Sequence, residues 1–322
     1  MPILDLDARL HHMRNKFITS ASNLGRKSAS SDYIKLIDAM NREYSQLANM
    51  LYHCGYQHLG LRVYSELEKT VHDCRTTTAS KYFKKGVAYH NQGTIYFNQG
   101  DYSRWIAYVE LAIREDRTLK HKGQAHRDLV TSVDSICEFI SSDLNLDTNF
   151  SHINPKAVIA RLIEGEKYRL IRIMLEFQHG LKDMRSLAVR DTAETNIMRI
   201  CKLTETYLKR KLGKSKTLNP LIQNAFTNST ARISKAGHDW LKDWQTNWLN
   251  GKMTDYRSIR DDTKIEQALK FRRDSVTQAF NMLTLLRNFT AHIHNDNSIL
   301  FRKYAECFNI CVRAFLYSVR HV

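Results

Sequence analysis

The stretch that decides the fold is residues 86–116, which read GVAYHNQGTIYFNQGDYSRWIAYVELAIRED. Apolar and aromatic side chains recur at helical spacing on both sides of an Asn-Gln-Gly-Asp turn at 98–101. That period is typical of amphipathic helices, and a glycine suits the turn because it has no Cβ. The small Gly93 before the turn and Ala112 after it suit a close approach of two helices. The stretch therefore predicts an antiparallel helical hairpin.

A second hairpin is predicted at residues 31–69, with its break near Cys54-Gly55. When Gly55 is aligned with Gly100, the helices that precede the two turns match position by position. Tyr44, Leu47, Ala48 and Leu51 then align with Tyr89, Gln92, Gly93 and Tyr96. The block at 86–116 resembles a tetratricopeptide repeat. The two turns are 45 residues apart, whereas a regular array repeats about every 34 residues, so the repeats would be degenerate and lengthened. An ordinary pair of helical hairpins is the alternative.

The composition favours an all-α chain. Only 3 prolines and 12 glycines occur among 322 residues, and both residue types are unfavourable inside helices. Further helices are predicted at 121–141, 155–178 and 192–212. The length allows two hydrophobic cores, and we place a helical-repeat, regulatory domain at 1–190 and a second helical domain at 191–322.

The expected second domain holds three long helical patterns. The helix at 192–212 is stopped by Gly213, a residue that favours helix C-termini. A long helix is expected over about 263–287, and a last one over about 298–320. Three tryptophans lie between the helix at 192–212 and the one at 263–287, spaced four residues apart. Such a stripe is more typical of a core or interface than of a base-stacking platform. The three are Trp240, Trp244 and Trp248.

The formal net charge of +16 concerns partners rather than fold. Polyanions are natural partners for such a chain, and RNA and DNA are the commonest polyanions. A diffuse positive charge without a nucleic-acid partner, or an acidic protein partner, would fit the same composition.

The six cysteines are expected to be buried structural thiols in a reducing compartment, because they form no CxxC pair. Cys307 and Cys311 lie four apart, but no matching His or Cys pair completes a zinc site. We therefore expect no metal and no cofactor. The first residues lack the apolar core of a signal peptide, and no stretch is apolar enough to span a membrane. These observations predict a cytoplasmic protein without a membrane partner.

The most chemically suggestive segment is Arg-Asn-Phe-Thr-Ala-His at 287–292. Positions four or five apart lie on neighbouring parts of one helix face. Arg287, Asn288 and His292 could therefore converge on one phosphate. Histidine can exchange protons near neutral pH, arginine offers a planar fork for phosphate oxygens, and an amide can position either group.

This segment resembles the R-N-x-x-x-H signature of the HEPN (higher eukaryote and prokaryote nucleotide-binding) ribonucleases. Residues 204–213 are similar to the first core helix of that domain, and the resemblance covers about 192–322. It implies a HEPN-type helical bundle and a metal-independent endoribonuclease whose active site forms at a dimer interface. By this resemblance His292 is the acid–base residue, Arg287 binds phosphate and Asn288 positions the reacting groups. His294 and Asn295, just beyond, are expected to contact substrate.

Three functions fit these features. The first is a ribonuclease of a prokaryotic defence or toxin-type system that cleaves single-stranded RNA by attack of the 2′-hydroxyl, acts as a homodimer and is controlled by a protein partner at the N-terminal repeats. The second is a non-catalytic adaptor that dimerises through its C-terminal domain and recruits a protein through its repeats. The third is a catalytic subunit of a larger RNA-guided effector. No glycine-rich strand-to-helix turn of a nucleotide-sensing domain is present.

Overall fold

The computed structural model describes ten ranges of the chain: 5–24, 29–117, 123–143, 153–181, 187–213, 218–227, 265–266, 269, 275–289 and 299–322. Every regular element within these ranges is a helix, and none of them contains a strand. The predicted all-α class is therefore confirmed. None of the helices in these ranges is long and apolar enough to cross a membrane. The chain divides into two compact units, Met1–Thr131 and Ser132–Val322.

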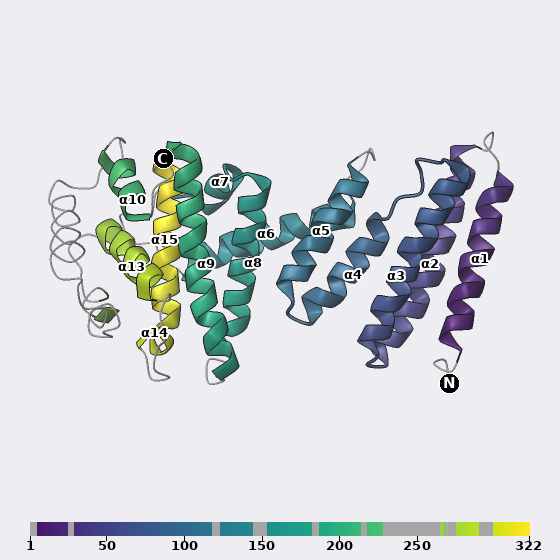
Figure 1. Ribbon diagram of the computed structural model, residues 1–322, viewed down its shortest axis with the longest axis horizontal. Coiled ribbons are helices and arrows are strands. Elements are labelled where there is room, and N and C mark those ends of the chain that lie inside the picture. Colours follow the sequence, from purple (N-terminus) through teal and green to yellow (C-terminus); the bar gives the residue numbers. More distant parts are fainter. Residues whose placement is uncertain are drawn as a thin grey trace. The chain divides into compact units, whose positions relative to one another are not determined.

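The N-terminal unit consists of helices, the first five of which follow one another as neighbouring antiparallel segments (Figure 1). They are α1 (Leu6–Leu24), α2 (Ser30–His53), α3 (Gln57–Thr78), α4 (Gly86–Asn98), α5 (Tyr102–Asp116) and the beginning of α6 (Gln124–Asp143). Helix α3 packs against α1, α2 and α4, and α4 pairs with α5. Both predicted hairpins are present as α2–α3 and α4–α5. Their assignment to the tetratricopeptide class stays a prediction.

The two hairpin turns follow from local sequence. Gly55 and Gly100 take positive φ angles of 86° and 75°, a region that side chains with a Cβ rarely adopt. Asp101 caps α5, because its carboxylate accepts a hydrogen bond of 3.0 Å from the backbone N–H of Arg104. A Cβ on Gly93 would lie 3.3 Å from the Cβ of Tyr108. The glycine thus permits the close approach of α4 and α5.

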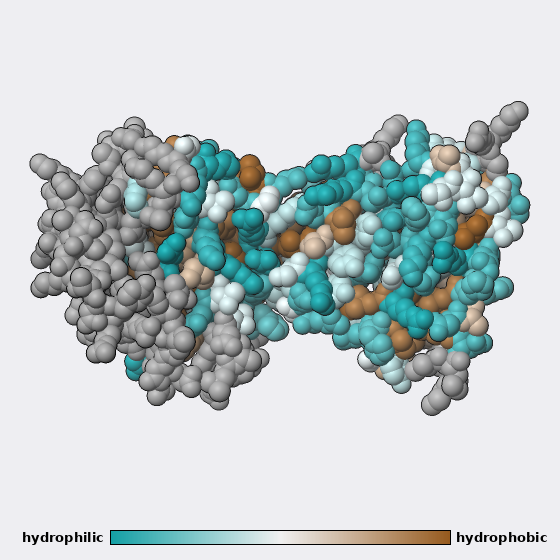
Figure 2. All heavy atoms as spheres, in the orientation of Figure 1, coloured by the Kyte–Doolittle hydropathy of each residue, from teal (hydrophilic) through white to brown (hydrophobic). Residues whose placement is uncertain are grey.

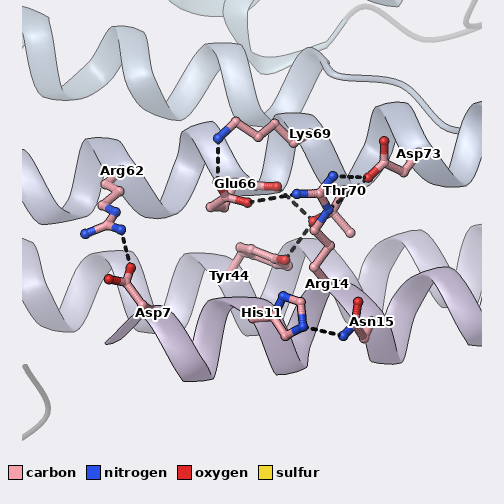
Figure 3. Close-up of polar contacts among 10 residues, drawn as sticks. All are labelled: Asp7, His11, Arg14, Asn15, Tyr44, Arg62, Glu66, Lys69, Thr70 and Asp73. Carbon is pink, nitrogen blue, oxygen red and sulfur yellow. Dashed lines mark hydrogen bonds and ion pairs between the residues drawn. The ribbon is translucent and has the colours of Figure 1, made fainter. Parts of the chain in front are cut away.

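Helix α1 was not predicted from the sequence. It buries one apolar stripe against α2 and α3, formed by Leu6, Leu10, Met13, Phe17 and Ala21. Figure 3 shows polar contacts among α1, α2 and α3. The Nε of Arg14 donates a hydrogen bond of 2.9 Å to Oδ2 of Asp73 on α3, and Nη2 forms an ion pair with the same oxygen at 2.6 Å. The hydroxyls of Tyr44 and Thr70 lie 2.8 Å apart between α2 and α3.

The described helices of the C-terminal unit form a bundle around α9 and α15 (Figure 1). They are most of α6, α7 (Pro155–Ala160), α8 (Glu164–Gly180), α9 (Leu187–Leu212), α10 (Leu218–Thr227), α13 (Ser275–Phe289), α14 (Ile299–Arg302) and α15 (Tyr304–His321). Helix α9 ends at Gly213, whose φ is 61°, as the sequence predicted. A helical bundle is present, and its membership of the HEPN class stays a prediction.

Helix α15 is the central element of this bundle. It contacts α7, α9, α13 and α14, and almost every residue from Cys307 to Val319 is buried. The sequence predicted one helix over about 298–320 with a single apolar face. The chain instead breaks at Lys303 into α14 and α15. Because buried residues occupy nearly every position of this stretch, α15 lies in the interior of the bundle rather than on its surface.

The division between the units lies at 131/132, earlier than the domain boundary expected at 190/191. The reason is that α8 contributes to the core around α15. The ring of Phe177 on α8 stacks on Phe308 with centroids 4.0 Å apart and an angle of 11°. Buried Glu166, at the start of α8, receives two hydrogen bonds of 2.7 Å from Arg210 on α9. Helices α7 and α8 therefore belong to the C-terminal unit.

Candidate active site

The first three residues of the predicted catalytic segment, 287–289, lie on the last turn of α13. This helix is anchored along its length by buried apolar side chains, which are Val276, Ala279, Phe280, Met282, Leu283, Leu285 and Leu286. The ring of Phe280 packs edge-on against Tyr317 of α15, with centroids 6.0 Å apart. The Cys201 thiol of α9 donates a hydrogen bond of 3.5 Å to the carbonyl of Leu283. Contacts with two helices thus fix the position from which Arg287 extends.

Arg287 lies against a carboxylate of α9. Its Nη2 is 3.7 Å from Oε2 of Glu205, and the two side chains are 36% and 12% exposed. Glu205 also accepts a hydrogen bond of 2.6 Å from Nζ of Lys209, one turn further along α9. A cation in the last turn of a helix is favourable, because the exposed carbonyls there carry partial negative charge. The helix end and Glu205 together hold the guanidinium in place.

This arrangement has the properties of an anion-binding group. Two cations, Arg287 and Lys209, both contact the carboxylate of Glu205. The guanidinium is planar, and its N–H donors have the fork geometry that matches two oxygens of a phosphate. A partly exposed fork of this kind can bind two oxygens of a phosphate while Glu205 restrains its direction.

Sequence reasoning did not select Glu205 as a site residue. It lies inside the stretch at 204–213 that resembles a core helix, and its spacing from Lys209 is that of a helical ion pair. Its approach to Arg287 joins positions 82 residues apart and becomes visible only when α9 and α13 are packed together.

The remaining predicted site residues lie at or beyond the end of the described helix. Asn288 belongs to α13 by its backbone, and its side chain is outside the described part of the chain. His292, His294 and Asn295 also lie outside the described residues, as do the three tryptophans between 240 and 248. The convergence of Arg287, Asn288 and His292 on one phosphate therefore stays a prediction.

The two cysteines of α15, Cys307 and Cys311, offer no competing nucleophile. Burial raises the pKa of Cys307 to about 12. Burial, together with a hydrogen bond to Cys201, raises the pKa of Cys311 well above its ordinary value. Both side chains are therefore neutral thiols at physiological pH, and nucleophilic attack needs a thiolate. Of the six cysteines, Cys54 alone is exposed. Within the described ranges, no group of three or more His, Cys, Asp or Glu side chains could hold a metal ion.

Comparison with known proteins adds no assignment: no protein-family model, no curated protein and no solved structure matches this chain. The functional interpretation rests on the motif at 287–292 and on the packing that presents Arg287.

Proposed function

We propose that this chain is a metal-independent endoribonuclease of the HEPN type that cleaves single-stranded RNA. The observation that carries the proposal is the placement of Arg287. This first residue of the R-N-x-x-x-H segment extends, partly exposed, from the end of a well-anchored helix and is restrained by Glu205. The net charge of +16 supports a polyanionic substrate.

In the proposed reaction His292 accepts the proton of a ribose 2′-hydroxyl, and the resulting oxygen attacks the adjacent phosphorus. The bond from phosphorus to the 5′-oxygen breaks, and an imidazolium returns a proton to that leaving oxygen. The products are a 2′,3′-cyclic phosphate and a 5′-hydroxyl. Arg287 stabilises the charge that develops on the non-bridging oxygens, and Asn288 positions either the phosphate or the imidazole. His294 and Asn295 contact the substrate.

Two copies of the segment, one from each protomer of a homodimer, form the proposed composite site. One copy supplies one arginine and one histidine, whereas the reaction needs both a base and an acid. The N-terminal helical unit binds a protein partner that controls the nuclease, in a cytoplasmic defence or toxin-type system. Light scattering at micromolar concentration tests the dimer, and a strict monomer that cleaves RNA would contradict the composite site.

The activity is tested by incubating the full-length protein with single-stranded RNA in EDTA. We expect cleavage by the wild type and a loss of about 100-fold or more for Arg287→Ala, the range observed when one transition-state donor is removed. Arg199→Ala is a matched control. Arg199 belongs to the same unit, is 33% exposed and is also paired with a glutamate, Glu176.

Arg199→Ala is expected to stay folded and retain activity within about threefold, because Glu176 keeps Arg172 as a second partner and a part-exposed ion pair contributes little to stability. Equal losses in the Arg287 and Arg199 variants would indicate a general effect of positive charge and contradict a catalytic role for Arg287. No cleavage by the wild type, alone or with a partner, would favour the non-catalytic adaptor.

A further inference from the structure

The N-terminal unit contains a cavity that the proposed RNA chemistry does not use. Its volume is about 650 Å³, within the range of about 300–1,000 Å³ typical of ligand sites. The walls come from α2, the connection before α4, α4 itself, the end of α5 and the start of α6. A smaller cavity of about 180 Å³ lies further along the same two helices, α2 and α4.

One wall of the larger cavity is apolar and open to solvent. Ile34 of α2 is 49% exposed and Val87 of α4 is 40% exposed. Figure 2 shows apolar patches interrupting an otherwise hydrophilic surface over the N-terminal helices. Covering exposed aliphatic side chains with an apolar group is favourable, because it removes apolar surface from water. The ligand should therefore carry an apolar part.

A carboxyl group also lines this cavity, that of Asp116 at the end of α5. Burial is the largest influence on this carboxyl and raises its pKa above the ordinary value, and the neighbouring Glu115 raises it further. His90 and Lys84 act in the other direction and do not cancel the effect of burial. No hydrogen bond or ion pair to Asp116 occurs among the described residues. A half-buried carboxylate without a partner is costly, and a cation placed beside it would be strongly favoured.

Two glycines make room for this carboxylate. A Cβ on Gly86, at the start of α4, would lie 2.1 Å from Oδ1 of Asp116. A Cβ on Gly123, just before α6, would lie 2.1 Å from Oδ2. Any side chain at either position would displace the carboxylate. Bare backbone from two separate segments therefore allows Asp116 to occupy the wall of the cavity.

Amide side chains line the smaller cavity, further along α2 and α4. They are Asn49, Asn91 and Asn98. Asn49 accepts a hydrogen bond of 3.2 Å from Tyr64, Asn91 bonds Ser45 at 3.3 Å and His90 at 3.1 Å, and Asn98 donates one bond of 2.9 Å to Tyr52. An amide can make up to four hydrogen bonds, so these side chains, here called the amide row, have donors and acceptors left for a peptide backbone.

We propose that the surface formed by these two cavities binds an extended segment of a partner protein, with an apolar side chain against Ile34 and Val87 and a lysine or arginine at Asp116. The amide row pairs with the backbone of the bound segment, which selects a polypeptide over a small amine. Lys81 and Lys84 also line the cavity. They reach the ligand from the connection before α4 and select against a second basic residue there, because like charges repel. This site does not depend on the ribonuclease activity.

The test uses phage display of random dodecapeptides on the full-length protein. We expect the wild type to enrich peptides in which a lysine or arginine adjoins an aliphatic residue. A synthetic peptide of the enriched type should bind Asp116→Asn at least about 10-fold more weakly, as expected for the loss of one charged contact. Glu110→Gln is the matched control, since it removes the same charge from a surface position of α5, and it should change the affinity less than about twofold.

Replacing the basic residue of the peptide by glutamine should cause the same loss on the wild type and no further loss on Asp116→Asn. Enrichment of acidic peptides, equal affinity for wild type and Asp116→Asn, or the absence of any enriched peptide would overturn the proposal. Circular dichroism confirms that Asp116→Asn is folded. Because the readout is peptide binding, its failure leaves the RNA cleavage test unaffected.

Discussion

Replacing Phe177 by alanine tests the assignment of α8 to the C-terminal core. The Phe177 ring is fully buried, stacks on Phe308 at 4.0 Å and meets Tyr304 edge-on at 5.2 Å. Removing a buried phenylalanine costs about 3–5 kcal/mol. A third ring, Phe139, lies 6.0 Å away, and aromatic pairs worth about 0.5–1.5 kcal/mol each place this position in the upper half of that range. We therefore expect a loss of ~4 kcal/mol in the free energy of unfolding of the C-terminal unit.

For a unit of this size the loss corresponds to a fall in Tm of roughly 10–15 °C. Urea unfolding followed by circular dichroism measures the free energy, and calorimetry measures Tm. Leu181→Ala is the matched control, because Leu181 follows α8 directly and is 37% exposed. It should cost less than about 1 kcal/mol. A Phe177→Ala variant that loses no more than this control would refute the packing of α8 on α15.

Three further predictions concern the units and their sites. A fragment of residues 132–322 should unfold cooperatively, whereas one of 191–322, which lacks α8, should not; denaturant titrations distinguish them. Asp116→Asn should be more stable than the wild type at pH 7. Burial raises the folded pKa of Asp116, so its charge destabilises the fold above that pKa, and the difference should vanish at low pH, where both states are protonated. Arg287→Lys should keep the charge but lose the fork, so that kcat for RNA falls by about 10-fold or more with little change in Tm.

The helical hairpins could be predicted because their determinants are local. Gly55 and Gly100 mark turns that the apolar period on either side already defines, and Gly213 marks the end of α9 in the same way. Helix α1 carried an equally local signal in Leu10, Met13 and Phe17.

The unit boundary could not be read from local patterns. The apolar stripe of α8 shows which face is buried but does not identify its partner. That partner, Phe308, lies 131 residues further along the chain. A helix between two others can pack on either side, so the placement of α8 depends on long-range complementarity.

Each candidate site likewise combines features that depend on local sequence with features that depend on long-range packing. The sequence predicted a helix that ends at 287, and α13 ends at Phe289, so Arg287 lies near a helix end as expected. Its contact with Glu205 was not predicted. The surroundings of Asp116 were equally invisible, since Gly86 and Gly123 reach it from two other segments.

The measurement that tests the central claim most directly is the cutting of a single-stranded RNA in EDTA by wild type and His292→Ala, with analysis of the fragment ends. We expect the wild type to leave 2′,3′-cyclic phosphates and 5′-hydroxyls. Loss of the acid–base residue should slow cutting by about 10²–10⁴-fold without unfolding the protein. Cutting by His292→Ala at the wild-type rate, or by the wild type at linkages that lack the 2′-hydroxyl, would contradict the account.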